Sequence, residues 1–194
     1  MTIKRRAFTL LEMLITITVL VMLSAVFMFA TLEATASADA ANIISNMNHI
    51  KAAILMWYKQ NSSRLVPDSS AGYKIRTDGT DQLVSEFVRD HSSEFLKYLD
   101  NTRSLTLSST KDNNTGDYSI MTANNAKKWY VCYNLGTTQT YSDMEASNIK
   151  IKSRLAGKAK SLGLFGKTQF DEKETKTVYT NQKFACMLVL DLGK

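Results

Sequence analysis

The pattern of apolar and polar positions divides the chain into three parts. Residues 13–32 read MLITITVLVMLSAVFMFATL, a run of twenty residues without a charge, a proline or a glycine. At about 1.5 Å per helical residue, this run is roughly 30 Å long, which is the thickness of the hydrocarbon core of a bilayer. The pattern therefore predicts a membrane-spanning helix near the N-terminus.

From residue 34 to residue 61 the apolar positions recur every three or four residues, and polar residues fill the other side of the helical wheel. The apolar positions are Ile43, Met47, Ile50, Ile54 and Trp57, with Ile44 and Tyr58 beside them. This spacing predicts that the helix continues as an amphipathic one whose apolar stripe packs on a globular domain. The residues 61–63 (Asn-Ser-Ser) and Pro67 are expected to end it.

Residues 62–194 predict a head of helices and strands that follows a loop rich in Ser and Asp. A helix capped by Thr80 or Asp81 is expected to run to about Tyr98, and a second, capped by Ser142 or Asp143, to about Gly163. Strands are expected at residues 104–108, 118–122, 128–135, 176–180 and 183–190. The inward helix positions are Leu83, Phe87, Phe95 and Leu99 in the first helix and Met144, Ile151, Leu155, Ala159 and Leu162 in the second.

The length of the chain bounds the number of its domains, and the charge pattern predicts its orientation in the membrane. The 194 residues leave room for one domain plus a membrane segment. The formal charge of +6 is mild and does not demand a nucleic acid partner. Three of the cations, Lys4, Arg5 and Arg6, precede the apolar run, so the positive-inside rule places this end in the cytoplasm and the head outside.

Glu12, at the start of the apolar run, bears on the two simplest interpretations of that run. A simple N-terminal anchor fits the run, and so does a cleaved secretory signal, since residues 34–36 and 36–38 have the small-x-small form of a cleavage site. The run is longer than the usual apolar region of such a signal. A carboxylate at the mouth of an apolar helix is costly without a partner and is by default a functional residue.

The decapeptide RAFTLLEMLI at residues 6–15 resembles the prepilin cleavage motif of type IV pilins and pseudopilins, which is a short basic leader followed by a small residue and Phe-Thr-Leu-x-Glu. The resemblance implies that prepilin peptidase cuts between Ala7 and Phe8, that the new Phe8 amine is methylated, and that Glu12 becomes the fifth residue of the mature chain. Ala7 departs from the usual Gly, and the membrane helix lacks the proline that many type IV pilins carry.

The same resemblance implies an assembly role for Glu12. Its carboxylate and the Phe8 amine of a neighbouring subunit are both costly near hydrocarbon, and pairing them offsets both costs and sets the stagger between subunits. The implied partners are copies of this chain or other pilins, prepilin peptidase, an assembly platform and motor, and the cytoplasmic membrane. The chain would span that membrane once before assembly and lie in an extracellular or cell-surface filament afterwards.

The expected fold is α+β and pilin-like: one long N-terminal helix packed on an antiparallel sheet. The expected divisions are a leader at residues 1–7, an assembly half of the helix at 8–33, an amphipathic half at 34–61, and a head at 62–194. Cys132 and Cys186 each lie in one of the two strongest strand signals. Outside the cytoplasm a disulfide between them is the better interpretation.

The second predicted helix is basic. Its cations are Lys150, Lys152, Arg154, Lys158 and Lys160. They are candidates for binding DNA or another polyanion. The alternatives are a solvated face, or ion pairs with acidic neighbours such as Asp171, Glu172 and Glu174.

The sequence gives little support for a metal site or for catalysis. His91 has Asp90 and Glu94 nearby, but a metal site needs more ligands than these, and no metal or cofactor is expected. We find no phosphate-binding loop and no nucleophile motif, so no enzymatic activity is expected. The functional classes that remain are a structural filament subunit, a minor pilin or competence pseudopilin that binds DNA or a surface ligand, and an anchored protein that does not polymerise.

Overall fold

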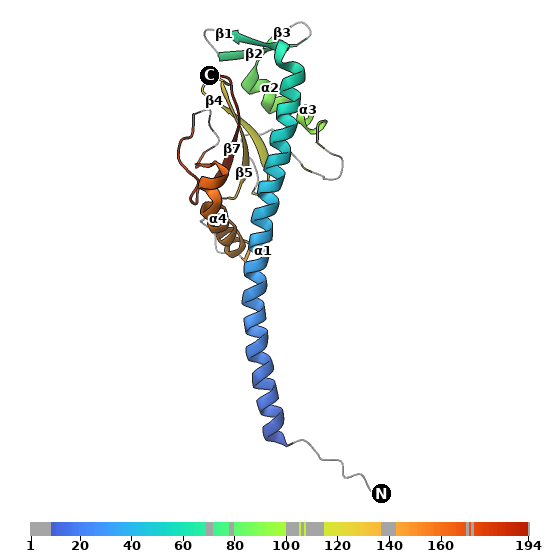
Figure 1. Cartoon of the computed structure of the whole chain (residues 1–194), viewed down its shortest axis with the longest axis vertical. Helices are drawn as coiled ribbons and strands as arrows, with labels where there is room; N and C mark the ends of the chain where they lie inside the picture. The colour runs from blue at the N-terminus through green and yellow to red at the C-terminus, as the bar shows by residue number, and fades with distance from the viewer. Residues whose placement is uncertain are drawn as a thin grey trace.

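A single long helix, α1 (Leu10–Asn61), forms the axis of the computed structural model (Figure 1). The structure describes residues 9–68, 72–77, 80–99, 105, 107, 115–136, 143–169, 171 and 173–193. With neither proline nor glycine inside it, α1 continues unbroken from the apolar run into the amphipathic stretch. Its end at Asn61, followed by the short 3-10 helix η1 (Ser62–Arg64), confirms the predicted stop.

The main sheet has four antiparallel strands in the order β4-β5-β7-β6. Their bounds are Tyr118–Ala123 for β4, Lys128–Asn134 for β5, Leu164–Lys167 for β6 and Phe184–Asp191 for β7. The long helix on an antiparallel sheet confirms the predicted α+β class. Both faces of the sheet are covered, because alternate side chains of β5 and β7 enter two separate apolar clusters.

The larger cluster lies between α1 and the sheet. Its centre is Trp57 of α1, which is 1% exposed. The Trp57 ring lies 4.9 Å from the ring of Phe95, 5.7 Å from that of Phe87 and 5.8 Å from that of Trp129, measured between centroids. The buried positions of α1 are Ala36, Ala40, Ile43, Met47, Ile50, Ala53, Ile54 and Trp57. This is the apolar stripe that the spacing predicts.

The segment after α1 differs from the expected loop and single helix. It forms a second antiparallel sheet of β1 (Leu65–Asp68), β2 (Gly72–Thr77) and β3 (Thr80–Leu83), followed by α2 (Val84–Asp90) and α3 (Ser92–Leu96). Thr80 and Asp81 therefore lie in a strand and cap no helix. Pro67 is tolerated in β1 because β1 is an edge strand. Phe87 and Phe95 are buried as predicted, whereas Leu83 and Leu99 are half-buried.

Two other strand predictions need correction. Residues 176–180 form no strand, and only Val178 makes an isolated bridge, to Phe165 of β6. β6 itself is absent from the prediction, since it is four residues long and contains Gly166. A Cβ at Gly166 would lie 2.0 Å from the Gln182 side chain, which explains a glycine in this strand. Of the expected strand at 104–108, the structure describes only Leu105 and Leu107, and Leu107 bridges Tyr118.

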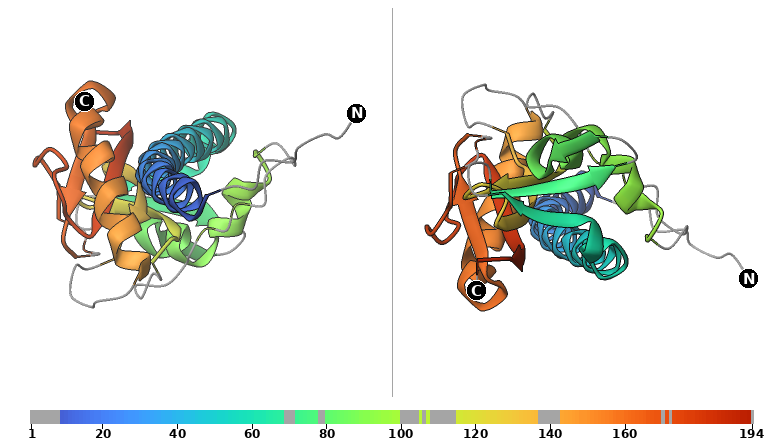
Figure 2. Two further views of the ribbon diagram at one scale, coloured as in Figure 1. Left: turned by 90° about the horizontal axis from the view of Figure 1, so that it is seen from below. Right: turned by 90° about the horizontal axis from the view of Figure 1, so that it is seen from above.

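The helix α4 (Asp143–Leu162) extends across the base of the head, transverse to α1, as the view from below shows (Figure 2). Ile151, Leu155 and Ala159 are buried as predicted, and Leu162 is half-buried. Ser142 and the side chain of Met144 lie outside the described residues. Gly163 follows the helix with φ +64°, a left-handed conformation that favours glycine at a helix end.

Cys132 of β5 and Cys186 of β7 face each other in the strand register and are joined by a disulfide. Both side chains are fully buried in the smaller cluster, on the face of the sheet away from α1. They are 54 residues apart in the sequence, and their link closes a loop that contains α4 and β6.

Removing this disulfide should destabilise the head by about 4 kcal/mol, because the unfolded chain regains the entropy of the closed loop. The change is Cys132→Ala with Cys186→Ala, and the measurement is chemical unfolding of the full chain in detergent micelles. Wild-type protein under strong reductant is the matched control and should unfold at the midpoint of the double variant. Equal midpoints for variant and oxidised wild type would contradict the prediction.

Candidate functional site

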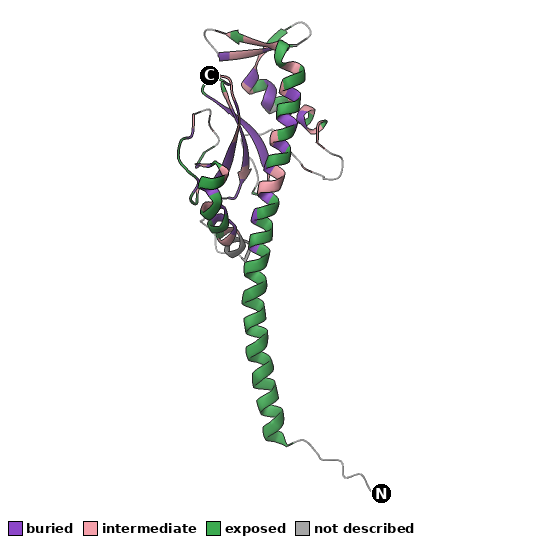
Figure 3. Ribbon diagram, viewed as in Figure 1, coloured by how far each residue is buried: buried purple, intermediate pink, exposed green. Residues whose placement is uncertain are grey.

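The N-terminal half of α1 projects from the head without any cover (Figure 3). Sixteen large apolar side chains between Leu10 and Leu32 are each 43–84% exposed. They point in all directions around the helix, which is typical of a helix immersed in lipid or surrounded by other helices. The most apolar stretch of α1 is entirely unburied and is long enough to cross a membrane.

The first turn of α1 is closed by a capping box. The Thr9 backbone N–H donates to Glu12 Oε2 at 3.0 Å, and the Thr9 hydroxyl donates to the same oxygen at 2.9 Å. In return, the backbone N–H of Glu12 donates to Thr9 Oγ1 at 3.3 Å. The Thr-x-x-Glu spacing is a sequence signature of this arrangement, and the interpretation of Glu12 as a charge that needs a partner does not include it.

The capping box changes what Glu12 contributes before any neighbour is present. A carboxylate is favourable at a helix N-terminus, where the free N–H groups carry partial positive charge. Both hydrogen bonds from Thr9 end on Oε2, and neither uses Oε1. The carboxylate can therefore cap its own helix and still accept a bond from another donor. Ala7 and Phe8, the predicted cleavage pair, lie outside the described residues.

The acidic residue directly after the apolar run, Glu33, joins α1 to α4. Its carboxylate receives Lys150 Nζ at 3.3 Å on one oxygen and the Arg154 guanidinium on the other. The hydrogen bond from Arg154, followed by that from Lys150, lowers the pKa of Glu33. These three side chains are partly exposed, so the ion pairs are screened by solvent and contribute more to position than to stability.

The five cations of α4 that are predicted candidates for polyanion binding have different surroundings in the structure. Lys150 and Arg154 pair with Glu33, and not with Asp171 or Glu174, which pair instead with Lys167 and Lys128. Glu172 lies outside the described residues. Lys158 and Lys160 remain as exposed cations of α4.

Lys152 is the clearest departure from that prediction, because its side chain is buried. It is 4% exposed, and its ammonium donates to the backbone oxygen of Gly136 at 2.8 Å. Burial lowers the pKa of Lys152. This lysine ties α4 to the end of β5 and is not available to bind a polyanion.

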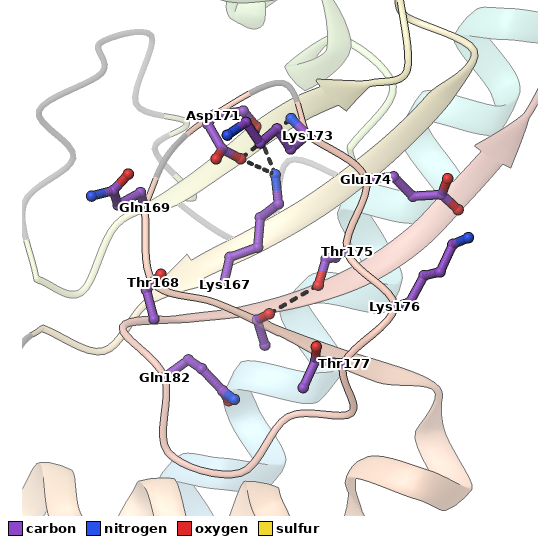
Figure 4. Close-up of a pocket in the computed structure, with 11 residues that line it drawn as sticks. Lys167, Thr168, Gln169, Asp171, Lys173, Glu174, Thr175, Lys176, Thr177 and Gln182 are labelled. Atoms are coloured by element: carbon purple, nitrogen blue, oxygen red, sulfur yellow. Dashed lines mark hydrogen bonds and ion pairs between the residues drawn. The ribbon is translucent and has the colours of Figure 1, made fainter.

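The connection from β6 to β7 encloses a polar recess of about 260 Å³ (Figure 4). Lys167, at its inner end, is 6% exposed, and its ammonium donates to the backbone oxygen of Asp171 at 2.6 Å and to its carboxylate at 2.8 Å. The Thr175 hydroxyl donates to the backbone oxygen of Gly166 at 2.9 Å. These bonds fix the shape of the connection. Hydroxyl, amide and charged groups line the recess, which suits a small polar molecule.

His91 takes no part in a metal site among the described residues, where no group of three His, Cys, Asp or Glu side chains could hold an ion. Its ring stacks on that of Phe87, with centroids 4.5 Å apart. The contact gives His91 a packing role between α2 and α3.

Comparison with known proteins adds one match. Residues 3–28 match the family model described as the prokaryotic N-terminal methylation motif. This motif is the signature of type IV pilins and pseudopilins, so the chain carries the signature of that class. No curated protein and no solved structure matches the chain. The match covers the start of α1 and none of the head.

The contact between Lys167 and Asp171 predicts a pH dependence of stability. Burial alone raises the pKa of the Asp171 carboxyl, but the hydrogen bond and charge of Lys167 outweigh it and lower the pKa below the ordinary 3.8. A carboxyl with a lowered pKa in the folded state stabilises the protein above its ordinary pKa and loses that effect as pH falls through the lowered value.

We therefore expect Asp171→Asn to lower the Tm by about 2 °C at neutral pH, and by progressively less as pH falls below about 3.8. Thermal unfolding of the full chain in micelles, followed by circular dichroism, measures both effects. Thr168→Ala, on the same connection, is the control and should leave the pH profile unchanged. If the difference in Tm between Asp171→Asn and the wild type stayed constant down to acidic pH, the stabilising contact between Asp171 and Lys167 would be contradicted.

Proposed function

We propose that this chain is a structural subunit of a type IV pilus or of a related filament of the type II secretion kind. The observation that carries the proposal is the uncovered N-terminal half of α1, which has the methylation motif at its start. An apolar helix exposed on all sides requires a nonaqueous surrounding. A bilayer supplies it before assembly, and the equivalent helices of neighbouring subunits supply it in a filament.

Processing would convert the precursor in the membrane into a subunit that can join a filament. Prepilin peptidase would remove residues 1–7 by cutting between Ala7 and Phe8 on the cytoplasmic side, and the Phe8 amine would be methylated. Residues 8–33 would then form the assembly segment, residues 34–61 the part of the helix that carries the head, and residues 62–194 the head. The chain would span the cytoplasmic membrane once before a platform and motor extract it into the filament.

Glu12 would guide each incoming subunit. Its carboxylate caps its own helix through Oε2, and Oε1 would accept the methylated Phe8 amine of a neighbour. A buried cation and anion stabilise each other when paired, and each is costly alone. Their pairing would fix the axial position of one subunit against the next, since no other charged side chain follows until Glu33.

Two alternatives compete with this proposal, and the measurement of the N-terminus below tests the second of them. A minor pilin or competence pseudopilin that captures DNA would need free cations, and the pairing of Lys150 and Arg154 with Glu33 and the burial of Lys152 weaken that interpretation. A protein that stays anchored in the membrane and never polymerises would keep the apolar helix in lipid permanently. Its N-terminus would remain uncut.

The mature protein should lack residues 1–7 and carry one methyl group on the Phe8 amine. Intact mass and N-terminal fragmentation of protein purified from the membrane and from sheared filaments measure both changes. Ala7→Gly is the matched variant and should be cut at the same bond. An intact N-terminus in both fractions would overturn the proposal in favour of a plain anchor.

Glu12→Gln separates the two roles of Glu12, because glutamine can still serve in a capping box but carries no charge. Removing one member of a buried ion pair costs about 3–5 kcal/mol, so incorporation into filaments should fall by roughly 100-fold or more while cleavage continues. The ratio of this protein in sheared filaments to that in membranes, measured by quantitative mass spectrometry, tests this.

Two further variants complete the comparison. Glu12→Ala removes both cap and charge, and it too should be cut yet fail to assemble. Glu86→Gln removes an exposed carboxylate from α2 of the head and should leave incorporation close to that of the wild type. Normal incorporation of Glu12→Gln would show that Glu12 acts as a helix cap alone.

A further inference from the structure

The helix α4 lies at the level where the apolar run of α1 ends. Leu32 is the last residue of that run, and Glu33, the next residue, is in direct contact with Lys150 and Arg154 of α4. If residues 13–32 fill the hydrocarbon core, Glu33 lies at its outer boundary. The polar layer of a bilayer is only about 5–8 Å thick on each side, so a helix touching Glu33 lies in or against that layer.

The orientation of α4 matches this position. It extends across the base of the head, transverse to α1, and the view along α1 from below shows it lengthwise (Figure 2). A helix with this orientation lies parallel to the membrane plane when α1 crosses the membrane. Its buried side faces the head through Ile151, Leu155 and Ala159, and Lys150 and Arg154 reach toward the membrane half of α1.

The charge of this surface is positive among the described residues. Besides the buried Lys152, α4 carries four cations, Lys150, Arg154, Lys158 and Lys160, against Asp143 and Glu145; Glu33 of α1 adds a third negative charge, which leaves +1. Lys158 and Lys160 are exposed, and so is Ile149, which is 54% exposed and adds an apolar side chain. Exposed cations on a helix that lies against a membrane are attracted to anionic headgroups, by about 1 kcal/mol for each Lys or Arg near the surface.

We propose that α4 is a membrane-docking helix that binds anionic phospholipid headgroups through Lys158 and Lys160 while the subunit waits in the membrane. The α4 surface is continuous with the spanning helix, so docking needs no separate encounter with a distant partner. This inference rests on the proposed function, because it requires that α1 spans the bilayer. Polyanions of the headgroup kind match the charge of α4, and the position at the end of the apolar run favours a lipid over DNA.

The test uses the full chain in nanodiscs, with amide hydrogen exchange of α4 as the readout. One set of nanodiscs contains phosphatidylcholine alone, and the other contains phosphatidylglycerol as well. Exchange in residues 157–162 should slow by up to roughly 30-fold in the anionic nanodiscs, the combined effect of two cations near an anionic surface. High salt should remove the difference because it shortens the range of the attraction to about 3 Å.

The variant Lys158→Gln with Lys160→Gln should lose the lipid-dependent slowing. The matched control is Lys59→Gln with Lys127→Gln, which removes two exposed cations, one from α1 and one from the turn before β5, and should retain it. All four positions are exposed; glutamine is compatible with a helix at Lys59, Lys158 and Lys160, and Lys127 lies in a turn, so both variants are expected to fold.

Three outcomes would overturn the inference. Equal exchange in both kinds of nanodisc, with the chain inserted, removes lipid docking but leaves the proposed function intact. Slowing by added duplex DNA in neutral nanodiscs, without slowing by anionic lipid, would make DNA the partner. Failure of the full chain to enter nanodiscs of either composition contradicts the membrane stage of the proposed function and this inference with it.

Discussion

The structure depends on one constraint: half of its longest helix has no protein to cover it. The head buries the stripe from Ala36 to Trp57, and nothing in the described part of the chain covers the apolar residues that precede Glu33. The two halves follow the same helical axis, so whatever surrounds the first half also determines where the second half and the head are held. The fold of the head is complete without the N-terminal half, whereas the N-terminal half is stable only in lipid or among other helices.

The carboxylates at the two ends of the apolar run, Glu12 and Glu33, have different kinds of partner. At the start, the Glu12 carboxylate caps its own helix, which reduces the cost of a charge at the edge of hydrocarbon. At the far end, Glu33 is held by two cations from a helix more than 110 residues later in the chain. The first arrangement leaves an oxygen available for a neighbour, and the second fixes the head to the boundary of the membrane segment. Together they mark the two ends of the uncovered apolar segment of α1.

The sequence predicts the elements whose patterns are long and regular, and misses those decided by contacts. The unbroken apolar run and the spacing from Ile43 to Trp57 predict α1 because periodicity over many residues is a strong signal. β4, β5 and β7 are predicted because their residues are rich in β-branched, aromatic or alternating apolar side chains. β6 is missed because four residues with a central glycine give no pattern, and residues 176–180 resemble a strand in composition but form only one bridge.

For the candidate site too, the sequence reveals regular patterns but not the contacts made in the folded chain. The cleavage and methylation motif is visible from residue types and spacing alone. The burial of Lys152 and the pairing of Arg154 with Glu33 are not, because Arg154 and Glu33 are 121 residues apart and meet only in the folded chain. A count of basic residues on α4 therefore overestimates the charge that is free to bind a ligand. The capping box, by contrast, could have been read from the Thr9-x-x-Glu12 spacing.

The disulfide has a mechanical consequence in addition to its thermodynamic one. In a filament under tension, load would enter each head along α1, a rod of 52 residues and roughly 80 Å. Ala185 and Met187 of β7 pack in the same cluster as α1, so force reaches β7 directly. The covalent link from Cys186 to Cys132 passes that force to β5 even if the hydrogen bonds between the two strands were broken. β5 and β7 would then stay joined at one point even after the hydrogen bonds between them are lost.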